Sequence, residues 1–249
     1  LGRVDGRERQ HPLVDLGRIP GLEYVKEEGG MLRMGGCPRE SSLEAPEVVR
    51  ARYPILPDTA KVIADPLVRN RATVGGNLAH GDPGNDHPAT MLALGAQVVA
   101  VGPKGERVIP VEKLFLGLFT TALQPDEILT EVRIPIPPPR SGGAYVKLER
   151  KVGDYATAAA AAQLTLSASG AVERAGIGLT NAGPTPVKAS AAEAHLRGRK
   201  PDAAAVAEAG RLPAPAAAPG APRRGTLRGQ RAMARGRGGR GPTRAPAGA

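Results

Sequence analysis

Apolar and polar positions alternate in some segments of this chain and follow a helical period in others. Alternation is typical of half-buried strands, and it predicts strands at residues 31–36, 96–101, 107–111, 127–136, 145–151 and 172–179. Apolar residues spaced three and four apart predict helices at residues 41–63, 89–94, 111–118 and 186–198, the first interrupted at Pro54 and Pro57. Residues 11–24 are expected to hold a short strand, a turn at Pro20-Gly21 and the start of a second strand. The mixture predicts an α+β protein.

One segment, residues 156–169, fits two structures. Five consecutive alanines at positions 158–162 favour a helix. The following Gln-Leu-Thr-Leu alternates, however, and Ser169-Gly170 is typical of a hairpin turn into the next strand. We therefore predict a strand here. The Pro- and Gly-rich run at residues 137–143 is the expected domain boundary.

The charge is concentrated at the C-terminal end. Nine arginines and no acidic residue lie between positions 210 and 249, so they account for nine of the formal net charge of +10 and leave +1 on residues 1–209. Alanine, glycine, proline and arginine bury too little apolar surface to offset the entropy of ordering, so we expect a disordered tail. The nearly neutral body gives no electrostatic reason to bind nucleic acid.

The chain contains a single cysteine, Cys37, which excludes an internal disulfide and an iron–sulfur cluster held by this chain alone. We expect Cys37 to be an inert small side chain. No apolar run approaches the ~20 residues of a membrane span, and no secretory signal pattern is present. These features favour a cytoplasmic protein.

The segment most informative about chemistry is Thr73-Val-Gly-Gly-Asn77, followed by Asp82-Pro-Gly-Asn-Asp86. Adjacent glycines allow the main chain to approach a ligand, and successive N–H groups form a concave anion site. Asp86 suits a hydroxyl of a ribose or ribityl chain. By residue type alone, an ordinary β-turn at the two glycines is the alternative.

The wider sequence resembles the FAD-binding medium subunit of molybdenum hydroxylases, the family of carbon monoxide dehydrogenase and xanthine dehydrogenase. VRNRATVGGNLAHGDPGNDHPATMLAL is similar to the second flavin loop of that family, in which a [ST]-[IV]-G-G-N stretch precedes D-P-x-x-D. HPLVDLGRIPGLEYV, PDEILTEVRIP, AYVKLERKVGDYA and TPVKASAAEAHLRG resemble further family segments in the same order. The resemblance covers about residues 11–199.

The resemblance implies a set of FAD-binding residues and no catalytic acid or base. It assigns Thr73, Val74, Gly75, Gly76 and Asn77 to the pyrophosphate loop, and Asp86 and Lys147 to contacts with the cofactor. It places Ile63 and Leu129 as apolar neighbours of the flavin and Tyr155 near the isoalloxazine ring. The alternatives are core positions for Ile63 and Leu129, a solvated strand lysine for Lys147 and a partly exposed strand end for Tyr155.

The same resemblance implies the fold. It predicts an FAD-binding domain of the vanillyl-alcohol-oxidase-like type that lacks its first subdomain, then a small α/β C-terminal domain and a disordered tail. The expected divisions are a remnant without structure (1–10), the second FAD subdomain (11–137), a linker (138–143), a partial C-terminal domain (144–205) and the tail (206–249).

Two departures from the family pattern put flavin binding in doubt. The family has a first flavin loop of the A-G-G-x-S-L type before the segment that matches His11, and residues 1–10 contain nothing similar. The arginine-rich tail stands where the family has C-terminal helices. These departures lead us to expect half a cofactor site, and a non-functional truncated remnant is therefore an alternative to a working subunit.

The function implied by the resemblance is electron transfer through FAD. A partner large subunit with a molybdopterin cofactor oxidises the substrate, and [2Fe–2S] clusters on a partner small subunit carry the electrons to the FAD. The FAD then passes them to NAD or another acceptor.

Two further alternatives come from the residues alone. His80, Asp82, Asp86 and His87 are of the types that bind metals, although their spacing is that of a loop. The Arg-Gly-rich run at residues 235–241 is of a kind that binds RNA, but no Phe or Tyr is interleaved in it. We expect neither a metal site nor specific nucleic-acid binding.

Overall fold

The computed structural model describes residues 14–212. The expected remnant at residues 1–10 lies outside the described residues. So do residues 213–249, which include the Arg-Gly run on which the RNA-binding alternative depends. Residues 206–209, expected to begin the tail, instead belong to helix α7. The expected tail therefore started a few residues too early.

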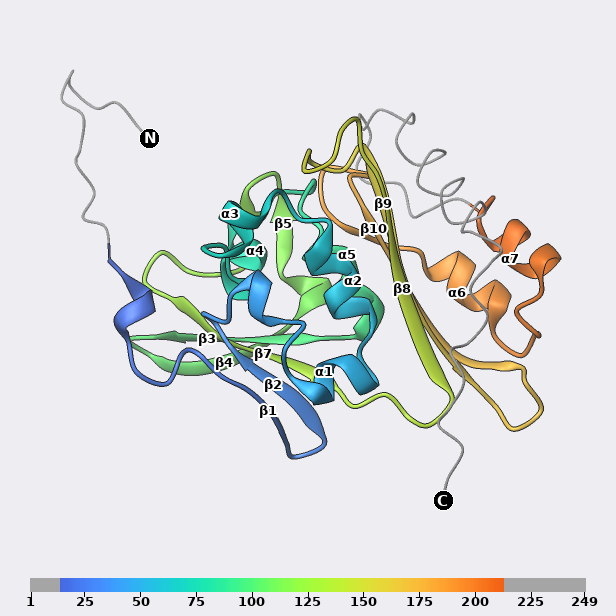
Figure 1. Ribbon diagram of the computed structural model, residues 1–249, viewed down its shortest axis with the longest axis horizontal. Helices are drawn as coiled ribbons and strands as arrows, with labels where there is room; N and C mark the ends of the chain where they lie inside the picture. The colour runs from blue at the N-terminus through green and yellow to red at the C-terminus, as the bar shows by residue number, and fades with distance from the viewer. Residues whose placement is uncertain (1–13, 213–249) are drawn as a thin grey trace.

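Two antiparallel sheets form the framework (Figure 1). The first sheet has the order β1 (Val25–Glu28), β2 (Met31–Gly35), β7 (Ile128–Pro135), β3 (Gln97–Gly102) and β4 (Gly105–Pro110). The second sheet has the order β11 (Val187–Lys188), β10 (Val172–Thr180), β9 (Ala158–Leu166) and β8 (Ser141–Leu148). A short ribbon pairs β5 (Phe115–Gly117) with β6 (Thr120–Thr121).

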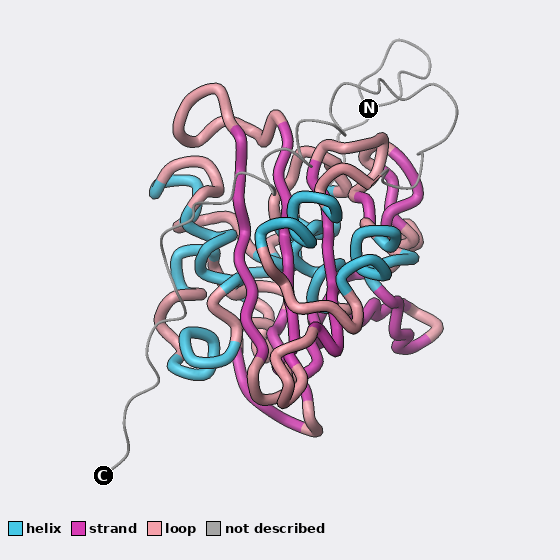
Figure 2. Tube along the Cα trace, turned by 90° about the vertical axis from the view of Figure 1, so that its right-hand side faces the viewer, coloured by secondary structure: helices cyan, strands magenta, loops and turns pink. Residues whose placement is uncertain are grey.

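Short helices fill the space between the sheets and cover the far side of the second one (Figures 1 and 2). The inner group consists of α1 (Glu47–Arg52), α2 (Ile55–Lys61), α3 (Pro66–Arg69), α4 (Val74–His80) and α5 (His87–Leu94). Of these, α4 contacts β7 of the first sheet, while α2 and α5 contact the second sheet. On the opposite face of the second sheet, α6 (Ser190–Leu196) packs on β10 and α7 (Ala203–Ala209) packs on α6.

The alanine-rich segment is strand β9, as predicted, and its small side chains have a packing reason. Alternate alanines of β9 face two different cores, Ala159 and Ala161 toward α5 and Ala160 toward α6. The neighbouring strand β10 carries Gly176 and Gly178 where a Cβ would collide with the backbone of α5. Small residues on both strands therefore allow α5 to approach the sheet closely.

Several predicted elements are confirmed, including the strands β2, β7, β9 and β10, the β3–β4 hairpin and the helix break at Pro54. The second break, expected at Pro57, is wrong, because Pro57 lies in the first turn of α2, where a proline is tolerated. The helix expected at residues 111–118 is wrong. A 3-10 turn, Val111–Lys113, leads into strand β5, whose residues from Phe115 on are partly or fully exposed and offer no apolar helical face. The expected linker is also shorter than predicted, because β8 begins at Ser141.

Two other segments differ in part from the structure predicted for them. Residues 14–24 contain a 3-10 turn, Leu16–Arg18, and the first strand begins only at Val25. The helix expected from residue 186 is preceded by strand β11 and begins at Ser190. The α+β class itself is confirmed. Within residues 14–212, no helix combines the length and apolar character needed to cross a membrane.

Candidate functional site

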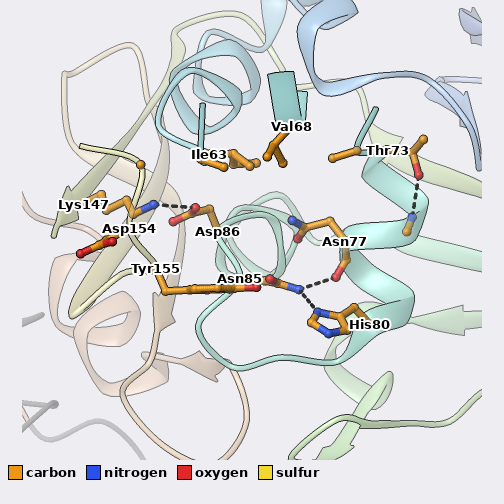
Figure 3. A pocket seen from close by; sticks show the side chains of 14 residues that line it. Ile63, Val68, Thr73, Asn77, His80, Asn85, Asp86, Lys147, Asp154 and Tyr155 are labelled. Atoms are coloured by element: carbon orange, nitrogen blue, oxygen red, sulfur yellow. Dashed lines mark hydrogen bonds and ion pairs between the residues drawn. The ribbon is translucent and has the colours of Figure 1, made fainter. Parts of the chain in front are cut away.

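A cavity of about 380 Å³ lies between the inner helices and the second sheet (Figure 3). Its walls come from α3, α4, the loop before α5, strand β8 and the loop that follows β8. Cofactor and ligand sites are typically concave and of roughly 300–1,000 Å³. The cavity is therefore of a suitable size and shape for a bound organic molecule.

Seven of the ten predicted site residues line this cavity, namely Ile63, Thr73, Gly76, Asn77, Asp86, Lys147 and Tyr155. They span more than ninety positions of the sequence; Lys147 lies on β8, which packs against α2, and Tyr155 lies on the loop that follows β8. The other three, Val74, Gly75 and Leu129, are not among the lining residues.

The Thr73–Asn77 stretch forms the start of helix α4, so the β-turn alternative is wrong. Thr73 is the N-cap, and its Oγ1 accepts a hydrogen bond of 3.0 Å from the N–H of Gly76. A threonine at this position satisfies an N–H group that the helix itself leaves free. Asn77, one turn further on, faces the cavity (Figure 3).

Val74, Gly75 and Leu129 lie behind this surface. Val74 is fully buried in the core, and Leu129 is 6% exposed on β7. A Cβ on Gly75 would come within 2.5 Å of the carbonyl oxygen of Gly36. Gly75 therefore allows α4 to pack against the chain just after β2, whereas the resemblance implied that it touches the pyrophosphate.

A polar cluster forms the side of the cavity next to α4. Asn85 Nδ2 donates 2.8 Å to the carbonyl oxygen of Asn77 and lies 3.2 Å from Nδ1 of His80. The ring of His80 in turn packs against Phe119, with centroids 5.2 Å apart. Asn77 Oδ1 is buried and has no hydrogen-bond partner among the described residues. An orphaned polar atom at a cavity wall fits a bound polar group, because burying such an atom unpaired costs free energy.

Asp86 is the most strongly anchored polar side chain of the cavity. It is 5% exposed, and its Oδ1 accepts 2.5 Å from the hydroxyl of Tyr145. Its Oδ2 accepts 3.0 Å from Lys147 Nζ, which also donates 2.8 Å to the carbonyl oxygen of Val62. Burial raises the pKa of Asp86 above its usual value, and the nearby charge of Lys147 and the hydrogen bond from Tyr145 oppose that rise.

Lys147 on β8 and Tyr155 on the loop that follows β8 form the opposite side of the cavity. The Lys147 side chain is 2% exposed, so the solvated alternative for this lysine is wrong. Tyr155 is 65% exposed and lines the cavity (Figure 3). A partly open aromatic ring at a cavity wall is suited to stacking on a planar ring system.

The four residues of the metal alternative have separate partners. His87 Nε2 lies 2.6 Å from Glu40 Oε2, with both side chains fully buried. Asp82 Oδ1 accepts 2.8 Å from the N–H of Gly84, while His80 and Asp86 have the partners given above. Among residues 14–212 there is no group of three His, Cys, Asp or Glu side chains that could hold a metal ion.

Sequence reasoning missed several contributors. Val68, Ala72, Asn85 and Asp154 line the cavity, and Tyr145 supports it from behind. Asn85 lies within the quoted Asp82–Asp86 stretch, so its position next to Asp86 was an available signal. Tyr145 gave no such signal, because its role depends on how β8 pairs with β9.

Two family models match the chain. The FAD binding domain in molybdopterin dehydrogenase matches residues 4–137, and the CO dehydrogenase flavoprotein C-terminal domain matches residues 143–235. The chain belongs to this family of FAD-binding subunits. The family and its cofactor, FAD, are those that the sequence resemblance implied.

Individual relatives agree with the family match. The medium chain of carbon monoxide dehydrogenase from Hydrogenophaga pseudoflava is 43% identical over 187 residues, which are 75% of this chain and 65% of that one. The corresponding chain from Afipia carboxidovorans is 44% identical over 213 residues, 86% of this chain and 74% of that one. The chain thus spans about two thirds to three quarters of the length of these relatives.

Solved structures show the same fold. Carbon monoxide dehydrogenase from Hydrogenophaga pseudoflava superposes with a TM-score of 0.81 at 41% identity, covering 89% of this chain and 78% of that one. Quinoline 2-oxidoreductase from Pseudomonas putida 86 gives a TM-score of 0.78 at 29% identity, covering 88% and 78%.

Proposed function

We propose that the cavity holds FAD and that the chain is the electron-transfer subunit of a molybdenum hydroxylase complex. The observation that carries the proposal is the convergence of family-matched residues on one cavity. Thr73, Gly76, Asn77 and Asp86 come from the FAD-domain match, and Lys147 and Tyr155 come from the C-terminal match. Both matched parts of the chain thus contribute to a single cofactor site.

Different residues are proposed to bind different parts of the cofactor. Thr73, Gly76 and Asn77 are proposed to bind the phosphate-bearing part, through side chains and the exposed backbone of Gly76. Asp86 accepts a hydrogen bond from a sugar or ribityl hydroxyl, and Lys147 balances its charge. Tyr155 stacks on the flavin ring, and Ile63 packs on it from the apolar side.

The bound FAD would supply the redox chemistry, while this chain positions it and sets its surroundings. The proposal includes a partner small subunit with [2Fe–2S] clusters as electron donor and a partner large subunit with molybdopterin. NAD or another acceptor takes the electrons onward. Because NAD is an intracellular cofactor, the proposal places the protein in the cytoplasm.

Coexpression with the two partner subunits of a carbon monoxide dehydrogenase-type complex tests the proposal. We expect the purified complex to contain one FAD per copy of this chain, and the flavin absorbance to bleach when carbon monoxide is added anaerobically as the electron donor to the partner molybdenum subunit. Asp86→Ala should lower the FAD content without preventing assembly. A complex that assembles but contains no flavin would contradict the proposal.

A further inference from the structure

Tyr145 is a buried tyrosine that contacts the cofactor cavity only through another residue. It lies on β8, is 7% exposed and is not among the lining residues. Its hydroxyl donates 2.5 Å to Asp86 Oδ1 and lies 3.2 Å from Thr180 Oγ1 on β10. The residue paired with Tyr145 on the neighbouring strand β9 is Ala161, whose small side chain leaves room for the tyrosine ring. Two strands of the second sheet thus hold one phenol against the carboxylate.

The consequence for Asp86 follows from the number of acceptor positions. A carboxylate has two oxygens with two acceptor positions each. Tyr145 takes one position on Oδ1, and Lys147 takes one on Oδ2. With both oxygens anchored from the same strand, the carboxylate cannot rotate freely, and its remaining acceptor positions stay available to a ligand in the cavity.

We propose that Tyr145 is a positioning residue for FAD, which it orients indirectly by fixing Asp86. The inference rests on the proposed function, because it requires FAD to bind in this cavity. It extends that function to a residue that does not touch the cofactor, and it makes the second sheet part of the flavin site.

The charges around Asp86 give the proposal a pH signature. Lys147 faces the carboxylate directly, Glu149 lies 3.5 Å from the same ammonium group, and His87 is next in the chain with its ring bonded to Glu40. Burial raises the pKa of Asp86, and the hydrogen bond from Tyr145 lowers it. Loss of that hydrogen bond therefore raises the pKa further, so that Asp86 takes up a proton at a higher pH and becomes a weaker, uncharged acceptor for the ligand.

Titration of the purified full chain with FAD, followed by flavin fluorescence between pH 5 and pH 8, tests this inference. Tyr145→Phe keeps the ring and removes the hydroxyl. We expect about tenfold weaker FAD binding at neutral pH, as for the loss of one hydrogen bond to a charged group. We also expect the affinity to fall at a higher pH than in the wild type. Tyr53→Phe is the matched control, since it removes another buried hydroxyl, bonded at 3.3 Å to the carbonyl oxygen of Pro135 outside the cavity lining.

A double-mutant cycle with Asp86→Asn separates positioning from general damage. If Tyr145 acts through Asp86, Tyr145→Phe adds almost no further loss in the Asp86→Asn background. If Tyr145→Phe does not fold, Thr180→Val loosens the same phenol and should produce a smaller loss in the same direction. Suppose that the wild-type chain binds FAD but that Tyr145→Phe has the same affinity and pH profile, or that the losses in the cycle are additive. Either result would overturn the inference and leave the proposed function intact. A wild-type chain that binds no FAD would overturn both.

Discussion

Gly75 and Gly76 are neighbours in the sequence but have different surroundings. A Cβ on Gly75 would meet the backbone of Gly36, whereas a Cβ on Gly76 would meet only the Oγ1 of Thr73, at 2.8 Å. Gly76 is exposed at the cavity, and Gly75 is buried. The sequence predicted one role for both, because a Gly-Gly pair does not reveal which residue faces a ligand and which faces another part of the chain.

This difference predicts separate effects of substitution. Gly75→Ala should lower the free energy of unfolding by about 1–3 kcal/mol, since the new methyl group has to push α4 away from Gly36. Gly142→Ala is the control, because a Cβ there has no neighbour within 4 Å and Gly142 has no left-handed φ. Urea unfolding of both variants provides the measurement. Equal stability of Gly75→Ala and the wild type would show that the packing at Gly36 is looser than described.

The buried pair of Lys147 and Asp86 makes stability depend on pH. Lys147→Met leaves the Asp86 carboxylate buried without its cation, and breaking such a pair costs about 3–5 kcal/mol. The pKa of Asp86 is already raised by burial and rises further without Lys147. An acid whose folded-state pKa is raised stabilises the fold below its unfolded pKa and loses that contribution as the pH rises through the folded pKa.

The free energy of unfolding of Lys147→Met should therefore be closest to that of the wild type at acidic pH and furthest below it at neutral pH. Urea unfolding at pH 5 and at pH 8 measures the change, and the deficit is expected to be smaller at pH 5. Lys151→Met, at a side chain that is 71% exposed, should behave like wild type at both values. A deficit for Lys147→Met that does not vary with pH would indicate lost packing of the lysine stem and not an unpaired carboxylate.

At the level of elements, α4 depends on its cap. Thr73→Ala removes the bond to the N–H of Gly76 and should cost about 1 kcal/mol of stability. Asp202→Ala removes the equivalent cap of α7, where the carboxylate accepts 2.8 Å from the N–H of Ala205. We expect both variants to lose similar stability, but only Thr73→Ala to weaken FAD binding, because Thr73 lines the cavity. Equal FAD affinities in the two variants would show that Thr73 does not contact the cofactor.

Elements with a clear alternation were predictable from the sequence, and those that depend on distant partners were not. Strand β7 alternates along its length and was predicted nearly to its ends. Helix α4 was predicted as a loop, because two of its seven residues are glycines, and the contact with Gly36 that explains Gly75 cannot be seen in the local sequence. Strand β5 was predicted as a helix, because its pairing with β6 leaves no mark in the local pattern.

At the level of the whole molecule, the site joins the two family-matched parts of the chain. The motif around Thr73–Asn77 and Asp86 was recognisable in the sequence, because its glycines and carboxylate are close together. The convergence of Lys147 and Tyr155 on the same cavity came from the family resemblance, since 61 residues separate Lys147 from Asp86. The support of Asp86 by Tyr145 required the pairing of β8 and β9.

Every role proposed for these residues requires FAD to bind in this cavity. Equilibrium titration of the purified chain with FAD, followed by flavin absorbance and fluorescence, tests it most directly. We expect saturable binding of one FAD per chain, although residues 1–10 contain no first flavin loop, because Lys147 and Tyr155 add contacts to those of the Thr73–Asn77 stretch. Tyr155→Ala should weaken that binding roughly tenfold through loss of the stacking ring, and Leu116→Ala, an exposed apolar residue outside the cavity lining, should leave it unchanged. Absence of saturable binding by the wild-type chain, or binding that Tyr155→Ala and Asp86→Ala both leave unchanged, would show that FAD does not bind in this cavity.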